Sequence, residues 1–226
     1  AFGIYRSRPD TLALAIALFS SLAVLAAFFT DIVLSRQNEL DDSRTRLSGF
    51  TSQLAEHTSR SHEAIDALLA EMANDLSIRH RNWRDWTPSE GWEYTVQHHS
   101  RSLPQLRSLI VFDQKGDQRF ISTYYPTPHI NISDRPYFAP LKGGAEFTSY
   151  GPYVGRNSGR YSYALARRIH DGSGKFAGIA FAALEPGYFQ EFCWSGRISE
   201  ESEAVLINKK GQIVASCRPT DLSRHS

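Results

Sequence analysis

The feature that most constrains this chain is an uncharged run of 20 residues, TLALAIALFSSLAVLAAFFT, from Thr11 to Thr30. At ~1.5 Å per residue, a helix of this length matches the ~30 Å hydrocarbon core of a bilayer. A cleaved signal peptide is the alternative, but the apolar region of a signal peptide normally spans only ~7–15 residues. The run therefore predicts an uncleaved transmembrane helix.

The charges on the two sides of this run predict its direction across the membrane. Arg6 and Arg8 precede the run, whereas no lysine or arginine follows it until Arg36. Positively charged residues tend to stay on the cytoplasmic side of a membrane. We therefore expect a single span in the inner (plasma) membrane, with the N-terminus in the cytoplasm and the chain after Asp31 in the periplasm or outside the cell.

Residues 31–77 read as one long stalk helix. They contain no proline and one glycine, Gly49, and Leu40, Leu47 and Leu54 recur every seven residues. This spacing is typical of an amphipathic helix, whose apolar stripe either packs on its own domain or pairs with a second copy of the chain. We expect the half nearer the membrane to pair, which predicts a homodimer. The other half is expected to pack on the domain through a second apolar row, Phe50, Ile65, Leu69, Met72 and Leu76.

The remainder of the chain predicts an α+β domain. Thr87, Pro88 and Glu90 have the spacing of a helix N-terminus closed by a capping box, and this helix is expected to run to about residue 100. Beyond it, alternating apolar and polar residues between turn sequences favour β-strands. Five or six antiparallel strands are expected at 108–113, 118–125, 147–154, 160–169, 175–185 and in a hairpin at 203–217 that would complete the sheet.

Composition argues against several classes of function. The net charge is +1, and no basic stripe is interleaved with aromatic residues, so we expect no binding to nucleic acid. Cys193 and Cys217 are either two buried thiols or, outside the cytoplasm, a disulfide. The sequence contains no zinc pattern, phosphate-binding loop or Ser-His-Asp spacing, so we expect no catalytic residues, no metal and no cofactor.

The stretch ISDRPYF, residues 132–138, is the strongest candidate for a binding site. Arg135 lies two residues before Tyr137, with a proline between them that restrains the backbone. A guanidinium group can bind a carboxylate at two points, and it is costly to bury without a partner. Two structural alternatives remain open, in which Arg135 pairs with the adjacent Asp134 or with Glu185, which follows the apolar run FAGIAFAAL.

Tyrosines downstream of Arg135 offer flat apolar faces, each with one hydroxyl group. Most aromatic residues of a sheet belong to the core, so we expect two or three of these to line a cavity with Arg135. The candidates are Tyr137, Tyr150, Tyr153, Tyr161 and Tyr163.

The order of segments resembles a known family. A long helix leaves a membrane span, and the segments LPQLRSLIVFDQKGD, INISDRPYF, ARRIHDGSGKFAGIAFAALEPGYF and AVLINKKGQIVAS follow in that order. This order is similar to the extracytoplasmic Cache (PDC-type) sensor domain of bacterial transmembrane receptors, and specifically to the membrane-distal half of a double Cache module. The resemblance covers residues 31–218 and implies a PAS-like antiparallel sheet flanked by helices.

The resemblance also implies a small-molecule ligand such as an amino acid, a carboxylate or an amine. One subgroup of the family binds amino acids with an Arg-x-Trp-Tyr motif, an upstream tyrosine, a later tyrosine and an aspartate at a strand end. Ile130 stands at the upstream tyrosine position, and Glu185 stands where the aspartate would be. The predicted ligand-binding residues are Arg135, Tyr137, Phe138, Tyr150, Tyr153, Tyr163 and Glu185.

By resemblance, the signal passes through a dimeric helix to a cytoplasmic output domain, for which a diguanylate cyclase is our first expectation and a histidine kinase our second. A stalk that binds no ligand and an unrecognised extracytoplasmic enzyme are the alternatives. The expected organisation is a cytoplasmic N-terminus at 1–10, a transmembrane helix at 11–30, the stalk at 31–77, a sensor domain at 78–218 and the start of a continuation at 219–226.

Overall fold

The computed structural model describes residues 9–99, 103–196 and 203–217, and the chain divides into two compact units, residues 1–49 and 50–226. Helix α1 (Pro9–Ile78) begins in the first unit and ends in the second. Among the described residues, α1 alone is long and apolar enough to cross a membrane, and none of its most apolar window is buried in the protein. The window is therefore not a core helix of a soluble domain.

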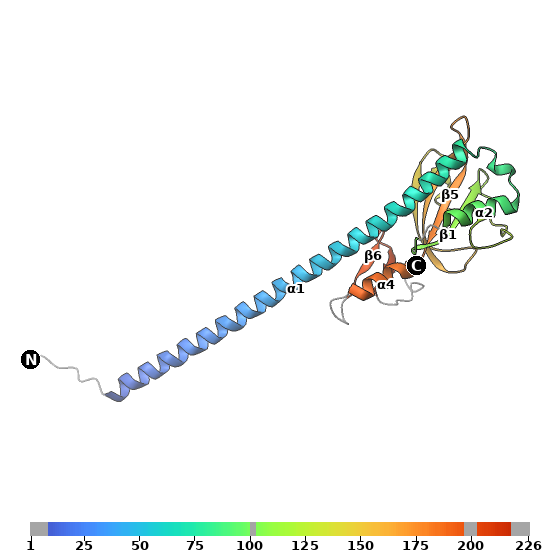
Figure 1. The fold of residues 1–226 in the computed structure, drawn as a ribbon. Coiled ribbons are helices and arrows are strands. Elements are labelled where there is room, and N and C mark those ends of the chain that lie inside the picture. The colour runs from blue at the N-terminus through green and yellow to red at the C-terminus, as the bar shows by residue number, and fades with distance from the viewer. Residues whose placement is uncertain (1–8, 100–102, 197–202, 218–226) are drawn as a thin grey trace, which may run out of the picture. The chain divides into compact units, whose positions relative to one another are not determined.

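The second unit is built on a five-stranded antiparallel sheet with the strand order β2-β1-β5-β4-β3. Figure 1 labels its strands β1 and β5. This fold class confirms the α+β prediction. The strands of this sheet are β1 (Leu106–Asp113), β2 (Gln118–Ile121), β3 (Phe147–Val154), β4 (Tyr161–His170) and β5 (Phe176–Leu184). The helices of this unit besides α1 are α2 (Pro88–His99), α3 (Phe138–Lys142), α4 (Pro186–Gly196) and a 3-10 helix at Trp83–Asp85.

Two apolar layers cover the two faces of the sheet. Strand alternation sends Leu109 and Val111 of β1 to one face, where they pack with α1 from Ile65 onward and with α2. Ile110 and Phe112 of the same strand point to the other face, which is covered by α3 and the loops around it. The candidate site lies on this second face, away from α1.

The N-terminus of α2 has the predicted capping box. The backbone N–H of Glu90 donates to Oγ1 of Thr87 at 3.3 Å, and the backbone N–H of Thr87 donates to the Glu90 carboxylate at 2.7 Å. These two bonds satisfy donors that the first turn of a helix leaves without intrahelical partners.

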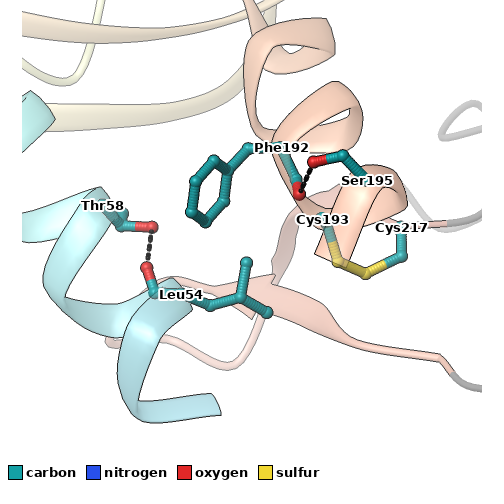
Figure 2. Close-up of a disulfide and its surroundings, with 6 residues drawn as sticks. All are labelled: Leu54, Thr58, Phe192, Cys193, Ser195 and Cys217. Atoms are coloured by element: carbon teal, nitrogen blue, oxygen red, sulfur yellow. Dashed lines mark hydrogen bonds between the residues drawn. A yellow bond between two sulfur atoms is a disulfide. The ribbon is translucent and has the colours of Figure 1, made fainter. Parts of the chain in front are cut away.

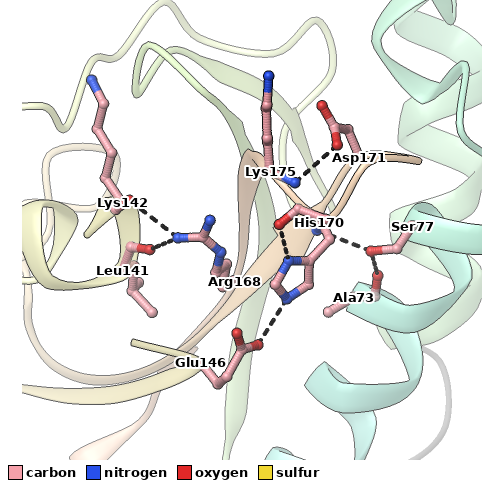
Figure 3. Close-up of polar contacts among 10 residues, drawn as sticks. Ala73, Ser77, Leu141, Lys142, Glu146, Arg168, His170, Asp171 and Lys175 are labelled. Carbon is pink, nitrogen blue, oxygen red and sulfur yellow. Dashed lines mark hydrogen bonds and ion pairs between the residues drawn. The ribbon is translucent and has the colours of Figure 1, made fainter. Parts of the chain in front are cut away.

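Polar contacts at one end of β4 tie the sheet to its helices (Figure 3). Nη1 of Arg168 donates to the backbone carbonyl of Leu141 in α3 at 2.6 Å. The backbone N–H of His170 donates to Oγ of Ser77 in α1 at 3.0 Å, while its Nε2 lies 2.9 Å from a carboxylate oxygen of Glu146. These contacts fix β4 against α1 on one face and α3 on the other.

The prediction that the 203–217 hairpin completes the main sheet is wrong. Strands β6 (Val205–Ile207) and β7 (Ile213–Ser216) form a separate two-stranded sheet. The reason is that β7 packs against α4, and Cys217, directly after β7, is bonded to Cys193 of α4. These contacts hold the short hairpin at α4 rather than at an edge of the main sheet.

The two cysteines therefore form a disulfide, which was one of the two alternatives left open by the sequence (Figure 2). Cys193 and Cys217 are buried together with Leu54 of α1, and Phe192 of α4 packs against the same cluster. The disulfide thus lies in the contact between α1, α4 and the small sheet.

Candidate ligand-binding site

A cavity of about 210 Å³ opens on the face of the main sheet opposite α1. Its apolar floor comes from β1 and β5, namely Ile110, Phe112, Phe181 and Ala183. The walls come from the chain around β2, from 130–137 and from 153–162. This volume lies below the ~300–1,000 Å³ typical of pockets for drug-sized ligands, so the cavity suits a smaller ligand.

Arg135 lines this cavity, and neither predicted carboxylate partner pairs with it. The carboxylate of Asp134 accepts from Nη1 and Nη2 of Arg156 at 3.0 and 2.6 Å. Glu185 binds Arg107 instead. Among the described residues, Arg135 makes one hydrogen bond, from Nη2 to the backbone carbonyl of Val154 at 3.2 Å, and no ion pair. The two alternatives that would have made Arg135 purely structural therefore do not hold in this part of the chain.

Tyr137 and Tyr153 also line the cavity. Both rings lie near Phe181 of the floor, with centroids 5.3 and 6.3 Å from it. Burial raises the pKa of Tyr137 and raises the pKa of Tyr153 to about 12. Both hydroxyl groups are therefore neutral at physiological pH and keep the proton with which a phenol donates a hydrogen bond.

The other four predicted site residues lie outside the cavity wall. Phe138 is buried in the core beside Phe176, and Tyr150 packs against Tyr137 with ring centroids 5.0 Å apart. Within the described part of the chain, Glu185 reaches the site through its ion pairs with Arg107 and Arg160, which line the cavity.

Tyr163 lies on the opposite face of the sheet, against α1. Its ring stacks on His62 of that helix, at 5.3 Å between centroids. The sequence contained the signal for this placement, because Tyr163 has the same strand parity as Leu165, which packs in the α1 layer. Ser162, of the opposite parity, does line the cavity.

Sequence reasoning missed three arginines of the cavity wall: Arg107, Arg156 and Arg160. Regular alternation along β1 would send Arg107 to the same side as Leu109, toward α1. An irregularity in the pairing of β1 with β5 between Leu106 and Ser108 instead turns Arg107 to the cavity side. Arg156 and Arg160 lie in the loop between β3 and β4, where no periodic pattern predicts direction.

The fold and the cavity are those of a sensor domain, with a helix packed on one face of an antiparallel sheet and a small, partly open cavity on the other. The chain belongs to the Cache domain family, because the family model dCache_1, described as a Cache domain, matches residues 33–224.

Solved structures of extracellular sensor domains share this fold. The extracellular domain of a proposed histidine kinase, rpHK1S-Z16, matches with a TM-score of 0.70 and 24% identity over 78% of this chain and 71% of that one. The sensor domain of the V. cholerae histidine kinase DctB matches at 0.54 and 17% over 81% and 68%. The ligand-binding domain of the Campylobacter jejuni chemoreceptor Tlp3 with L-valine matches at 0.59 and 13% over 80% and 72%. No curated protein sequence matches the chain.

Proposed function

We propose that this chain is the extracytoplasmic sensor of a membrane-anchored signalling receptor, and that it binds a small amino-acid-like or carboxylate ligand in the cavity beside Arg135. The proposal rests on the position of the Arg135 guanidinium and on its lack of an ion pair with the described residues. It lines an aromatic-walled cavity, and no carboxylate of the described chain forms an ion pair with it. A partly enclosed cation without an ion-pair partner favours an anionic ligand.

The residues around Arg135 support the same role. Tyr137 and Tyr153 provide neutral hydroxyl groups and ring faces, while Phe181 provides an apolar floor. Small-molecule sites are typically built from such apolar walls with a few polar groups that fix the ligand's orientation. Tyr150 and Phe138 would then act behind the wall by supporting Tyr137 and α3.

The membrane arrangement is part of the proposal. Helix α1 supplies the candidate span, and the arginines before it favour a cytoplasmic N-terminus and a periplasmic sensor domain at 78–218. Leu40 and Leu47 of the stalk are 53% and 48% exposed in a single chain. Their seven-residue spacing supports pairing of two stalks in a homodimer.

A chain of polar contacts leads from the cavity to α1 and supports a route for the signal. Arg107 lines the cavity and binds Glu185 through Nε and Nη2 at 2.8 and 2.7 Å. The backbone N–H of Glu185 donates to the carbonyl of Gln105, whose side chain donates to the carbonyl of Ser61 in α1 at 3.3 Å. A ligand that binds Arg107 differently in two states would shift the balance between them at α1.

For the output domain we propose a diguanylate cyclase first and a histidine kinase second. The named histidine kinases among the structural neighbours support the second choice, and the family resemblance supports either.

A thermal-shift screen of amino acids, carboxylates and amines tests ligand binding. At a concentration of 100 Kd, a ligand stabilises the folded state by ~2.7 kcal/mol, which corresponds to a rise in Tm of about 5–11 °C for a domain of this size. The Arg135→Ala variant should lose most of this rise while folding normally. Arg79→Ala is the matched control, because Arg79 pairs with Asp75 and does not line the cavity. A flat screen would favour a stalk that binds no ligand.

A further inference from the structure

The charged residues around the cavity indicate the charge of its ligand. Four arginines line it: Arg107, Arg135, Arg156 and Arg160. The lining residues of the described chain include no aspartate and no glutamate. Two carboxylates reach these arginines from behind the wall, Asp134 at Arg156 and Glu185 at Arg107 and Arg160. The site therefore has about two positive charges more than the protein itself balances.

These positive charges gather at two poles. At the first pole Asp134 is bound by Arg156, and the nearby Arg135 adds to the positive field that lowers the pKa of Asp134. At the second pole Arg107 and Arg160 both approach the carboxylate of Glu185, at 2.7 and 3.7 Å. The first pole combines Arg135 of the loop before α3 with Arg156 of the β3–β4 loop, and the second combines Arg160 of that same β3–β4 loop with Arg107 of β1.

Tyr153 lies within the influence of both poles. Burial raises its pKa to about 12, and the charges of Arg107 and Arg135 both act in the opposite direction. Tyr153 lines the same cavity as the four arginines, so a molecule in that cavity can contact the phenol ring and the arginines together.

Spare hydrogen-bond donors are present at each pole. A guanidinium has five N–H donors. Among the described residues Arg135 uses one of them, on Val154. Arg160 contacts Glu185 at 3.7 Å, and its side chain is 67% exposed, so it is free to turn toward a ligand. Arg107, by contrast, is 14% exposed and is held by Glu185 and by Ser162.

We propose that the ligand is a small dianion without an ammonium group, such as a short dicarboxylate, with one anionic group at Arg135 and Arg156 and the other at Arg160 and Arg107. This inference rests on the proposed function and narrows it. A zwitterionic amino acid fits less well, because its ammonium group would meet cations at both poles and no carboxylate in the described lining. The volume of about 210 Å³ suits a chain of three to six carbons with two carboxylates.

The test compares ligands that differ by one charge. Isothermal titration calorimetry on the whole chain in detergent would use the dicarboxylates malonate, succinate, glutarate and adipate. Each is paired with its monoamide, which keeps the shape and removes one charge. Phosphoglycolate tests whether a phosphate can replace a carboxylate, and L-valine represents the zwitterions. At least one dicarboxylate should bind at least 10-fold more tightly than either its own monoamide or L-valine.

Two variants test which arginines bind each anionic group of the ligand. Arg160→Gln should reduce the preference for the dicarboxylate over its monoamide several-fold, and Arg135→Gln should weaken both compounds. Arg79→Gln should change neither, since Arg79 lies outside the cavity. The comparison in the wild-type chain needs no variant, so it remains decisive if a substitution impairs folding.

The outcomes distinguish a failure of the dianion inference from a failure of the proposed sensing function. If L-valine or another zwitterion binds more tightly than every dianion, the dianion inference is wrong while the sensing function stands. Equal affinity of a dicarboxylate and its monoamide overturns the inference in the same way. If no compound of any class binds, the proposed function fails with it.

Discussion

Removing the disulfide should destabilise the second unit by an amount that its loop length sets. Cys193 and Cys217 are 24 residues apart. In the chain-entropy model, releasing a loop of this length restores entropy to the unfolded state worth about 3.4 kcal/mol at 25 °C. For a domain of this size, that loss lowers Tm by about 7–14 °C. The contact of this region with Leu54 of α1 would weaken at the same time.

Differential scanning calorimetry with and without dithiothreitol measures this effect. The chain contains two cysteines, so within one chain the reductant has no other disulfide to reduce. A Cys193→Ser/Cys217→Ser variant should melt at the lower temperature, and the reductant should not shift it further. A Tm that changes by less than ~1 °C in both experiments would refute the reasoning and leave the cysteines without a stabilising bond.

Three further predictions follow from single contacts. Thr87→Ala removes the side-chain cap of α2 and should lower Tm by about 2–4 °C in a thermal melt, with Ser at this position restoring it. Burial lowers the pKa of His62 below 6.5, so its contribution to stability is complete above pH 6.5 and is lost as the pH falls below that value. In urea titrations, the free energy of unfolding should therefore fall more between pH 7.5 and 5.5 for the wild type than for His62→Gln. An equal fall in the two proteins would contradict this. Gly178→Ala would place Cβ 2.3 Å from the carbonyl oxygen of Phe112, so soluble folded protein should be lost, and a normal yield would show that the strands separate easily.

Much of the fold could be predicted from local patterns. The limits of β3 at Phe147–Val154 match the predicted strand, and the irregularity in its pairing with β4 between Tyr150 and Tyr153 contains the Gly-Pro pair that interrupts the extended stretch in the sequence. The capping box at Thr87 likewise depends on residues three apart. Such signals depend on neighbours in the sequence and need no knowledge of tertiary contacts.

The remainder depended on long-range geometry. The place of the 203–217 hairpin follows from its bond to α4, which sequence reasoning left open. The side on which Arg107 lies follows from a strand irregularity that alternation cannot reveal. Asp134, the neighbour of Arg135 in the sequence, is bound instead by Arg156, which lies 22 residues further along the chain. Among the described residues, Arg135 is therefore left without an ion-pair partner.

A structure of the chain with its strongest-binding ligand would test the central claim most directly. We predict that the ligand occupies the cavity over Phe181, with an anionic group within 3.2 Å of the Arg135 guanidinium. A ligand bound elsewhere on the domain, with Arg135 turned to solvent and the cavity filled only by water, would contradict the account.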